Sequence, residues 1–311
     1  MYDIIIVGGG PAGLTAALYA LRAGKSVFII EKSGFGGQIN SSPRIENMPG
    51  TPQISGSEFA DRLLDQVMSH GAKVELENVI SVSREGAHLS VLTEESRGSK
   101  YLAKAVILAT GVRHRMLGLP SERELVGRGI SFCAVCDGAF FSGRRVAVIG
   151  GGNSALQEAL LLSEICSEVV VVQDLAQFTA EKMLVEALAS KPNVRVLHST
   201  VVTGFESEKG ELTAVLLRNE QSGERSRLEL EGVFVAIGLI PENSAFKSVA
   251  AVDDAGYFAS GEDCRTHTDG VFVAGDCRVK SVRQLTTATA DGTVAALTAC
   301  NFIDNIGLVY R

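Results

Sequence analysis

Two cysteines three positions apart, Cys133 and Cys136, are the residues of this chain whose types and spacing best suit chemistry. At the start of a helix, such a pair can close a short disulfide loop, and the helix N-terminus stabilises one sulfur as a thiolate. The thiolate attacks a disulfide in another molecule, and the second thiol then resolves the mixed disulfide. The spacing therefore predicts thiol–disulfide exchange and a dithiol redox enzyme.

Two glycine-rich turns flank this pair, at residues 8–13 and 150–155. Each turn follows a short apolar run and opens a helix-like stretch, which is the context that makes such a motif indicative of dinucleotide binding. The second turn consists of Gly150, Gly151, Gly152, Asn153, Ser154 and Ala155. Two dinucleotide sites with a thiol pair between them would form a path for electrons.

Each glycine of the motif in the first turn has a structural role that its lack of a side chain makes possible. Gly8 permits a tight turn, Gly10 lets backbone amides approach a pyrophosphate, and Gly13 allows close helix packing. Glu31, at the end of the next strand, is placed to accept a hydrogen bond from a ribose hydroxyl. Taken by itself, this motif could also be a tight turn in another kind of α/β protein. The later Gly275-Asp276 pair, whose aspartate would open a helix beside a phosphate and a ribityl chain, favours a flavin dinucleotide in this half.

Composition narrows the class of protein. The 311 residues are 46% hydrophobic and 21% charged and include 33 glycines, which suits two α/β domains. A net charge of −7 without a long basic run argues against a nucleic-acid partner. The first strand begins almost at Met1, and no apolar stretch reaches the roughly 18 residues of a spanning helix, so we expect a soluble, cytoplasmic protein without a membrane partner. Six cysteines, of which only two are closely spaced, fit a reducing compartment.

The chain contains the same domain type twice. When the sequence is shifted so that Gly8 falls on Gly150, both turns lead into a helix and then a β-branched strand. A third late apolar strand, 270–276, has no counterpart in the inner copy and would return the chain to the first domain. The predicted fold class is α/β, with two Rossmann-like, three-layer dinucleotide-binding domains, the second inserted into the first. The predicted boundaries are 1–114 with 242–311 for the outer domain and 115–241 for the inner one.

Seven segments in order resemble the low-molecular-weight thioredoxin reductases, and the match spans nearly the whole chain. They are residues 8–13, 36–38, 46–50, 109–111, 133–138, 275–276 and 283–288. The resemblance implies a homodimer with FAD in the outer domain and a pyridine-nucleotide-like inserted domain that swivels. It also implies that the disulfide passes electrons from the flavin to thioredoxin or a thioredoxin-like protein.

The resemblance also implies roles for single residues. Cys136 would face the flavin, Cys133 would attack the substrate, and Asp137 would act as acid or base. The alternative for Asp137 is a carboxylate that only caps the first helical turn. The residues implied in FAD binding are Gly8, Gly10, Pro11, Ala12, Gly13, Glu31, Gly37, Gln38, Asn47, Thr110, Gly111, Asp276, Arg283, Gln284 and Leu285.

The inner domain departs from this family at one place. Members that use NADPH carry a His-Arg-Arg cluster and a further arginine after the second strand, which grip the adenosine 2′-phosphate. In this chain, the positions of the cluster are occupied by Gln173, Asp174 and Leu175, and the position of the further arginine is occupied by Thr179. Because an arginine fork pairs doubly with phosphate oxygens and an aspartate repels them, NADPH is disfavoured.

Two interpretations of the electron donor follow from this departure. In the first, Asp174 or Gln173 accepts the free 2′-hydroxyl of NADH, and the intact turn with Gly150, Gly152, Asn153 and Ser154 holds the nucleotide. In the second, the inserted domain has lost nucleotide binding and reduced ferredoxin is the donor, as in the ferredoxin-linked flavin thioredoxin reductases that this chain resembles in lacking the basic cluster. The loss of every clamp arginine favours ferredoxin.

Other interpretations of the cysteines and the C-terminal tail stay open at this point. A dithiol oxidase of a small natural product and a non-enzymatic redox sensor are the functional alternatives. Zinc at the cysteines, with Cys264 and His267 as a second pair, is disfavoured by the distance along the chain, so no metal is expected. Tyr310 would either stack on a flavin or pack at a dimer seam. Cys166, Cys277 and Cys300 are expected to fill the core.

Overall fold

The computed structural model describes residues 1–95 and 100–309, so the expectation for Tyr310 lies outside the described residues. The chain forms two compact units, one of Met1–Arg113 with Ile240–Arg311 and one of His114–Leu239. The chain leaves the outer unit through β7 (Val112–His114) and returns through β16 (Leu239–Pro241), and these two strands pair. Among the described residues, no helix is both long and apolar enough to cross a membrane.

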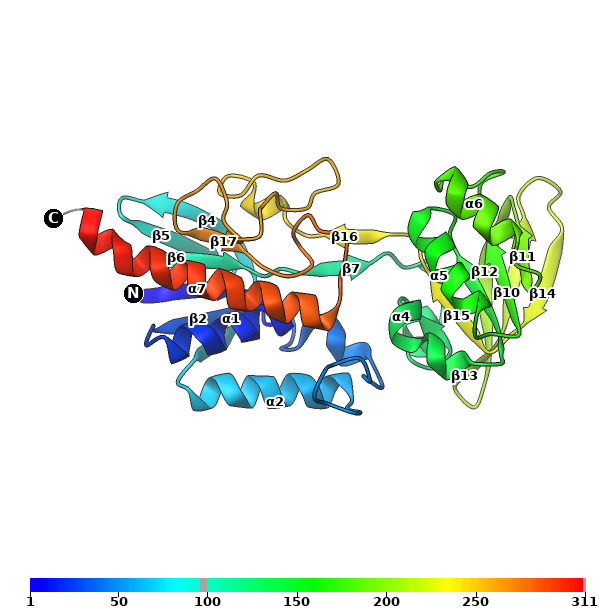
Figure 1. The fold of residues 1–311 in the computed structure, drawn as a ribbon, viewed down its shortest axis with the longest axis horizontal. Helices are drawn as coiled ribbons and strands as arrows, with labels where there is room; N and C mark the ends of the chain where they lie inside the picture. The colour runs from blue at the N-terminus through cyan, green and yellow to red at the C-terminus, as the bar shows by residue number, and fades with distance from the viewer. Residues whose placement is uncertain (96–99, 310–311) are drawn as a thin grey trace. The chain divides into compact units, whose positions relative to one another are not determined.

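The outer unit is built on a seven-stranded sheet (Figure 1). Its order is β3-β2-β1-β6-β5-β4, and β17 also pairs with β6. The strands are β1 (Tyr2–Val7), β2 (Val27–Glu31), β3 (Lys73–Leu76), β4 (Val79–Glu85), β5 (His88–Thr93), β6 (Lys100–Leu108) and β17 (Val271–Val273). Strands β1, β2, β3, β6 and β17 pair in parallel with one another, whereas β5 pairs antiparallel with both β6 and β4.

The apolar residues of β1 explain how this sheet is covered. Ile4 and Ile6 pack with helices on one face, and Ile5 and Val7 pack on the other, because successive side chains of a strand point to opposite faces. An unbroken apolar run is therefore the sequence pattern of a strand buried on both sides. The helices on the first face are α1 (Pro11–Arg22), α2 (Gly56–Ser69) and α7 (Leu285–Val309), and the short 3₁₀ segments of this unit are η1 (Gly37–Ser41) and η3 (Ser244–Phe246).

The inner unit repeats this plan with a five-stranded parallel sheet of order β11-β10-β9-β15-β8. Val146 and Val148 of β9 pack toward the helices, and Ala147 and Ile149 toward a three-stranded antiparallel sheet. The parallel strands are β8 (Ile130–Ser131), β9 (Arg145–Ile149), β10 (Glu168–Val172), β11 (Val194–Leu197) and β15 (Gly232–Val235). The second sheet contains β12 (Thr200–Glu208), β13 (Glu211–Asn219) and β14 (Arg225–Glu229), and the helical segments are α3 (Glu122–Leu125), α4 (Ala134–Asp137), η2 (Gly138–Phe141), α5 (Asn153–Ser163) and α6 (Lys182–Ala189). The predicted fold class is confirmed.

A buried carboxylate fixes the segment with which the inner unit begins. Glu122 is 1% exposed, and its two oxygens accept hydrogen bonds from the backbone amides of Leu117 (2.8 Å), Gly118 (2.7 Å) and Leu119 (3.2 Å). A carboxylate that accepts several amide hydrogen bonds ties down a loop that has no regular structure of its own.

Replacing Glu122 with glutamine should loosen this segment, because one acceptor oxygen becomes an NH₂ group that faces a backbone amide. An unsatisfied buried donor costs about 2 kcal/mol, which corresponds to a roughly 30-fold faster opening. Hydrogen exchange at the amides of residues 117–119 measures this opening directly. Glu124→Gln, on the exposed side of the same turn, is the matched control. Equal exchange in both variants would mean that the loop is held by other contacts.

Candidate redox site and dinucleotide turns

Cys133 and Cys136 form a disulfide, with their Cα atoms 5.3 Å apart. Cys133 is the N-cap of α4, and the backbone amide of Cys136 donates to its Sγ atom at 3.1 Å. Both cysteines are half-buried, and Val135 between them is 62% exposed, so another molecule can reach the pair. The predicted helix is only one turn long and continues as η2. Local amides rather than a long helix dipole therefore stabilise a thiolate here.

Asp137 ends α4, directly after the disulfide. Its Oδ2 atom accepts a hydrogen bond from Ser131 Oγ at 2.6 Å, and the same hydroxyl accepts one from the amide of Cys133 at 3.1 Å. The Oδ1 atom is buried without a hydrogen-bond partner among the described residues. Burial raises the pKa of Asp137, and the Ser131 hydrogen bond lowers it in part. The side chain makes no cap hydrogen bond, so the capping alternative is wrong.

Glu158 on α5 is a carboxylate beside this site that the sequence analysis missed. Burial raises its pKa to about 7, a hydrogen bond from the Ala134 amide lowers it, and the charge of Asp137 raises it further. The neighbouring residues Ala155, Ala159 and Leu162 on this helix are fully buried and form part of the apolar core. The sequence signal that could have identified Glu158 is a charged residue among the apolar positions of a helix.

The glycines of the first turn have the backbone geometry that was expected of them. Gly8 adopts a φ of +109°, and a Cβ atom there would collide with the carbonyl oxygen of Ala109. A Cβ on Gly13 would collide with the carbonyl oxygen of Gly8. At Gly10, the N-cap of α1, the nearest atom to such a Cβ is 4.0 Å away, so open space lies in front of the helix N-terminus. An anion can approach the free amides at this point.

Glu31 lies beside this turn, as expected. Its Oε2 atom accepts from the amide of Gly9 at 2.7 Å, and its Oε1 atom accepts from the amide and hydroxyl of Ser33 at 3.0 and 3.2 Å. These contacts fix the orientation of a carboxylate that is 8% exposed. Because Oε2 accepts only one of these hydrogen bonds, it keeps a further lone pair with which to accept from a hydroxyl group.

The outer unit brings other predicted residues toward the first turn. Gly37 lies against Gly10, since a Cβ on Gly37 would be 3.5 Å from the Cα atom of Gly10. Gly275 lies against Ala12, since a Cβ on Gly275 would be 2.8 Å from the Cβ atom of Ala12. The remaining predicted residues pair among themselves or with their surroundings. Asn47 donates to Gln284 at 3.3 Å, Thr110 donates to Asn243 at 2.7 Å, Gln38 donates to the carbonyl of Val112, Pro11 opens α1, Gly111 has a φ of +65°, and Leu285 begins α7.

Asp276 and Arg283 lie together next to these residues. The guanidinium of Arg283 donates to the carbonyl of Asp276 at 3.2 Å and lies 4.2 Å from the ring centroid of Tyr257. The Oδ1 atom of Asp276 is buried and has no hydrogen-bond partner in the part of the chain that the structure describes. Burial raises the pKa of Asp276, while the charges of Lys280 and Arg283 lower it. A buried acceptor of this kind suits a hydroxyl or phosphate-bearing ligand.

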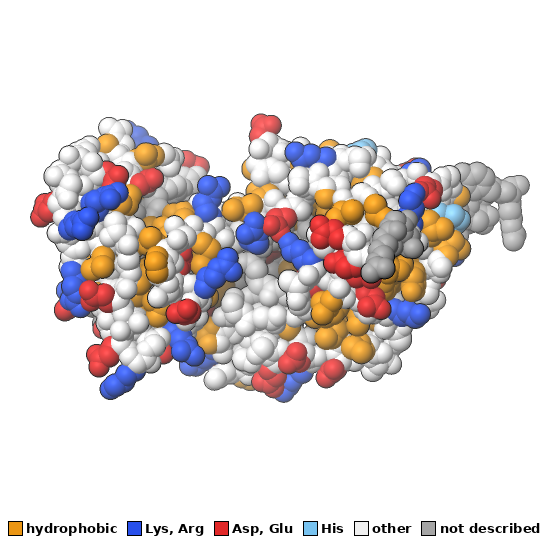
Figure 2. All heavy atoms as spheres, turned by 180° about the vertical axis from the view of Figure 1, so that it is seen from behind, with side chains coloured by type: hydrophobic (Ala, Val, Ile, Leu, Met, Phe, Trp, Pro, Cys, Tyr) orange, Lys and Arg blue, Asp and Glu red, His pale blue; other side chains and the backbone are white. Residues whose placement is uncertain are grey.

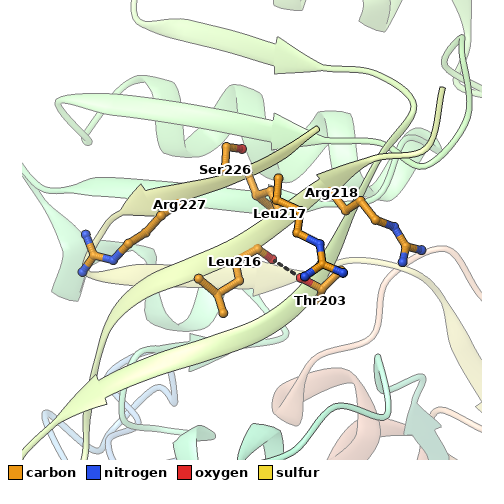
Figure 3. A pocket seen from close by; sticks show the side chains of 7 residues that line it. Thr203, Leu216, Leu217, Arg218, Ser226 and Arg227 are labelled. Atoms are coloured by element: carbon orange, nitrogen blue, oxygen red, sulfur yellow. Dashed lines mark hydrogen bonds between the residues drawn. The ribbon is translucent and has the colours of Figure 1, made fainter. Parts of the chain in front are cut away.

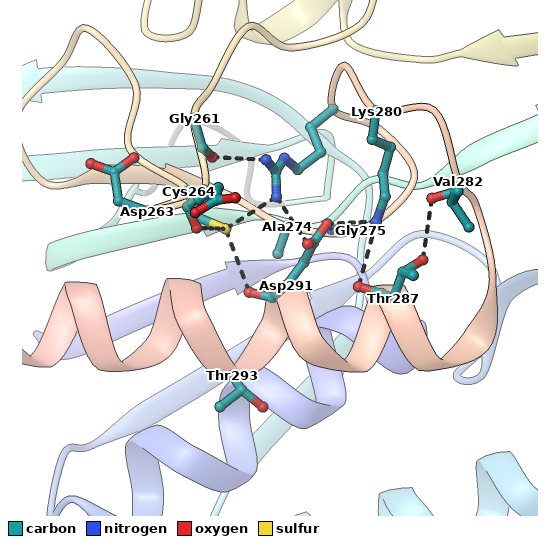
Figure 4. Close-up of polar contacts among 12 residues, drawn as sticks. Gly261, Asp263, Cys264, Ala274, Gly275, Lys280, Val282, Thr287, Asp291 and Thr293 are labelled. Carbon is teal, nitrogen blue, oxygen red and sulfur yellow. Dashed lines mark hydrogen bonds and ion pairs between the residues drawn. The ribbon is translucent and has the colours of Figure 1, made fainter. Parts of the chain in front are cut away.

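A polar cluster behind the Gly275-Asp276 turn was not foreseen (Figure 4). Asp291 on α7 accepts from Arg278 and from Lys280, both at 2.9 Å, and from the amide of Gly275 at 3.0 Å. Cys264 Sγ lies 3.6 Å from the Arg278 guanidinium, and burial raises the pKa of this thiol to about 11. Within residues 1–95 and 100–309, no group of three or more His, Cys, Asp or Glu residues could hold a metal ion. This cluster orients the turn that carries Asp276.

The second turn has the same backbone form. Gly150 has a φ of +133°, and Gly152 is the N-cap of α5 without a side-chain cap. Asn153 exchanges two hydrogen bonds with Glu181, at 2.9 and 2.8 Å, and Ser154 is exposed. The two residues expected to contact a ribose differ in position, because Gln173 is 3% exposed and packs against Gly151, whereas Asp174 is exposed.

A pocket on the second sheet of the inner unit contains no predicted site residue (Figure 3). Arg227 in this pocket pairs with Glu206 at 2.8 Å and also with Glu229, and Arg218 pairs with Glu220. The lining residues are Thr203, Leu216, Leu217, Arg218, Arg225, Ser226 and Arg227. On the face shown in Figure 2, Lys and Arg side chains likewise lie among Asp and Glu side chains.

The two glycine-turn units and the disulfide define a disulfide oxidoreductase, and comparisons with known proteins agree. The pattern of the pyridine nucleotide-disulphide oxidoreductase family matches residues 2–292. Thioredoxin reductases from Listeria innocua and Bacillus subtilis are 37% and 36% identical over 306 residues, which cover 98% of this chain and 95% and 96% of those proteins. The crystal structure of thioredoxin reductase from Streptococcus pyogenes is 37% identical, with a TM-score of 0.93 over 98% of this chain and 99% of that one.

The chain belongs to the low-molecular-weight thioredoxin reductase family. Membership implies FAD as the cofactor. The outer unit fits this group, because the Gly10 turn leaves open space at a helix N-terminus and Asp276 offers a buried, unpaired oxygen. The comparisons leave the electron donor open.

Proposed function

We propose that this chain is a flavin-dependent thioredoxin-disulfide reductase in which electrons pass from FAD through Cys133 and Cys136 to thioredoxin. The observation that carries the proposal is the disulfide at an accessible position, with an amide directed at Cys133 Sγ, in a chain of this family. FAD, when bound, supplies the two electrons that open the disulfide. A homodimer and a cytoplasmic location belong to the same proposal.

Cys133 is the better attacking sulfur of the two. The hydrogen bond from the Cys136 amide stabilises negative charge on Cys133 Sγ, which increases the fraction of thiolate. Attack on a thioredoxin disulfide forms a mixed disulfide and releases one thioredoxin thiolate, and Cys136 then displaces the second. Asp137 lies next in the chain, with its raised pKa, and is the group proposed to donate a proton to the first leaving sulfur.

The first turn and the Asp276 region would hold FAD. The amides at the start of α1 would face the pyrophosphate, with Pro11, Ala12 and Gly13 shaping the turn, and Glu31 would accept from the adenosine ribose. Asp276 would accept from the ribityl chain or phosphate side. Gly37, Gln38, Asn47, Thr110, Gly111, Arg283, Gln284 and Leu285 are proposed to line the rest of the site.

We propose reduced ferredoxin as the electron donor. The side chains at the place of the 2′-phosphate clamp are Asp174, Leu175 and Thr179, which provide no positive charge for NADPH. A specific observation favours NADH as the second candidate, because Asp174 is exposed just beyond β10 and the turn before α5 is intact. The same turn also serves simply to fold the βαβ unit, so its presence does not decide between the donors.

Anaerobic mixing of the oxidised flavoprotein with NADPH, NADH and reduced ferredoxin in turn should bleach the flavin absorption with ferredoxin alone. Stopped-flow absorbance measures the three rates under one set of conditions. Rapid bleaching by NADH that is slowed in Asp174→Asn, but not in Glu186→Gln on the exposed face of α6, would assign NADH instead. Rapid bleaching by NADPH would contradict both candidates.

A further inference from the structure

A serine hydroxyl joins the two ends of the redox turn. Ser131, at the end of β8, donates from Oγ to Oδ2 of Asp137 at 2.6 Å, and it accepts from the backbone amide of Cys133 at 3.1 Å. The residue is only 5% exposed, so water competes little for these two contacts. Ser131 therefore holds both the first cysteine and the carboxyl group that follows the second one.

The place of this hydroxyl is set by the sheet of the inner unit. Ser131 pairs with Phe234 of β15, and β15 pairs in turn with β9. Phe234 is fully buried in the core of this unit. A side chain on such a strand has a fixed position, whereas the short α4 turn carries the sulfur atoms that react. The sheet thus supplies a reference point for the redox turn.

The hydrogen bonds of Ser131 decide which oxygen of Asp137 can carry a proton. A hydroxyl group has one hydrogen to donate and lone pairs with which to accept. Because the Cys133 amide is a donor, it occupies a lone pair of Ser131 Oγ, and the single hydroxyl hydrogen is directed at Oδ2. A carboxyl proton on Oδ2 would leave that hydrogen without an acceptor among the described residues.

The other oxygen of Asp137 is free to take the proton. Its Oδ1 atom is buried and has no hydrogen-bond partner within residues 1–95 and 100–309. No hydroxyl or amide hydrogen in this part of the chain therefore competes with a proton on Oδ1. The hydroxyl of Ser131 makes the two carboxyl oxygens unequal, with Oδ2 as the acceptor and Oδ1 as the oxygen that can donate.

Few titratable groups face Asp137. The elements that pack most closely on α4 are α5 and η2, and Glu158 is the one titratable residue in their sequences. Burial raises the pKa of Glu158 to about 7, and the charge of Asp137 contributes to this rise. Cys166 donates to a carbonyl of η2, and burial raises the pKa of its thiol to about 11, so it stays uncharged.

We propose that Ser131 is a positioning residue for thiol–disulfide exchange, which presents the Asp137 carboxyl group with its transferable proton on Oδ1 and in fixed register with Cys133. This inference rests on the proposed function, in which Asp137 donates a proton to the leaving sulfur, and it adds the residue that orients this acid. Ser131 keeps its own hydrogen throughout the reaction.

The step is balanced in protons and electrons. The Cys133 thiolate attacks the partner disulfide, one S–S bond forms as another breaks, and the partner thiolate that leaves takes the proton from Asp137 Oδ1. Cys136 returns its own proton to the Asp137 carboxylate and displaces the second partner sulfur, which takes a proton from water. The enzyme dithiol is oxidised by two electrons to the disulfide, and the partner disulfide is reduced to a dithiol.

The test compares Ser131→Ala, which removes the hydroxyl, with Ser131→Thr, which keeps it. The matched control is Ser163→Ala on α5, because this serine is likewise buried and donates at 2.6 Å to the carbonyl of Leu160. The flavoprotein is reduced anaerobically with stoichiometric dithionite and mixed in a stopped-flow instrument with oxidised bacterial thioredoxin or with dithiobis(nitrobenzoate). The aromatic thiolate released from the second probe is a weak base that leaves without a proton, so a proton-delivery role affects thioredoxin alone.

Ser131→Ala should slow the thioredoxin reaction about tenfold at neutral pH, which is part of the roughly 10²- to 10⁴-fold that a general acid contributes. Burial raises the pKa of Asp137 and the Ser131 hydrogen bond lowers it. Because the acid must be protonated, the rate falls as pH rises through this pKa. Loss of the hydrogen bond should therefore move the decline about one pH unit upward, even though the plateau is lower.

The other variants and the second probe show whether the effect is specific. Ser131→Thr should keep the unsubstituted profile with a rate within about threefold, Ser163→Ala should match the unsubstituted enzyme, and dithiobis(nitrobenzoate) should react equally with all of them. Equal slowing with both probes, or an unmoved profile in Ser131→Ala, would show a merely structural role and overturn the proposal. A threonine variant that behaves like the alanine variant would contradict it as well.

Two further measurements separate this inference from the proposed function. In an Asp137→Asn background, Ser131→Ala should have no further effect on the thioredoxin rate, and an additional loss would contradict action through Asp137. Infrared spectra of the reduced protein report the C=O stretch of the protonated Asp137 carboxyl group, which Asp137→Asn identifies, without any thioredoxin. The pH at which this band disappears should be about one unit higher in Ser131→Ala. An enzyme that reduces no thioredoxin would refute the proposed function, whereas an unshifted band titration would refute the role of Ser131.

Discussion

Cys133→Ser and Cys136→Ser will each reduce thioredoxin turnover by at least about a thousandfold, because exchange needs one sulfur to attack and one to resolve. The two variants should nevertheless differ. Cys136→Ser keeps the attacking thiolate and will accumulate a mixed disulfide with thioredoxin, which non-reducing electrophoresis detects. Cys133→Ser lacks the sulfur that receives the Cys136 amide hydrogen bond and should form little of it.

Cys166→Ser is the matched control for this prediction. Cys166 is buried on the same unit, and burial raises the pKa of its thiol to about 11, so it contributes no thiolate at neutral pH. Its replacement should leave turnover unchanged while flavin content stays the same in all three variants. A mixed disulfide in Cys133→Ser rather than in Cys136→Ser would reverse the assigned roles of the two sulfurs.

Gly10→Ala should remove most of the flavin from the purified protein. A methyl group at this position meets nothing closer than 4.0 Å, so the fold tolerates it, but it fills the space through which a pyrophosphate would reach the amides of α1. We expect FAD binding to weaken by about 10- to 100-fold. Absorbance of the flavin per protein chain, before and after incubation with excess FAD, measures the change.

Gly152→Ala offers a matched control in the inner unit. A Cβ atom there would lie 3.7 Å from Thr179 Oγ1, so this substitution is also sterically tolerated. It should leave flavin content unchanged, and it should slow bleaching by NADH only if the second turn binds a nucleotide. Full flavin occupancy in Gly10→Ala would refute the assignment of FAD to the first turn.

Much of the fold could be predicted because its signals are local. The apolar runs before Gly8 and Gly150 predict strands buried on both faces, and the structure has β1 and β9 there. The positive φ of Gly8 and the close approach at Gly13 follow from steric limits that only glycine meets. The roles of the cofactor-binding residues stay predictions that the Gly10 experiment addresses.

Two details around the cysteine pair depend on packing. The helix expected after Cys133 is a single turn, because Gly138 and the segment after it pack closely on α5 and continue as 3₁₀ structure. Asp137 does not cap that turn, because the Ser131 hydroxyl binds its carboxylate instead. Ser131 belongs to β8, and its approach depends on how the sheet of the inner unit is ordered.

The sequence by itself determined the family, the two dinucleotide turns and the redox cysteines, since each depends on residues close together in the chain whose backbone conformation follows from their types. Only the tertiary structure decided which charges meet. Asp291 of α7 meets Arg278 and Lys280 and reaches the amide of Gly275 only across the packed outer unit. Such contacts follow from burial and helix placement, which no short segment of the sequence specifies.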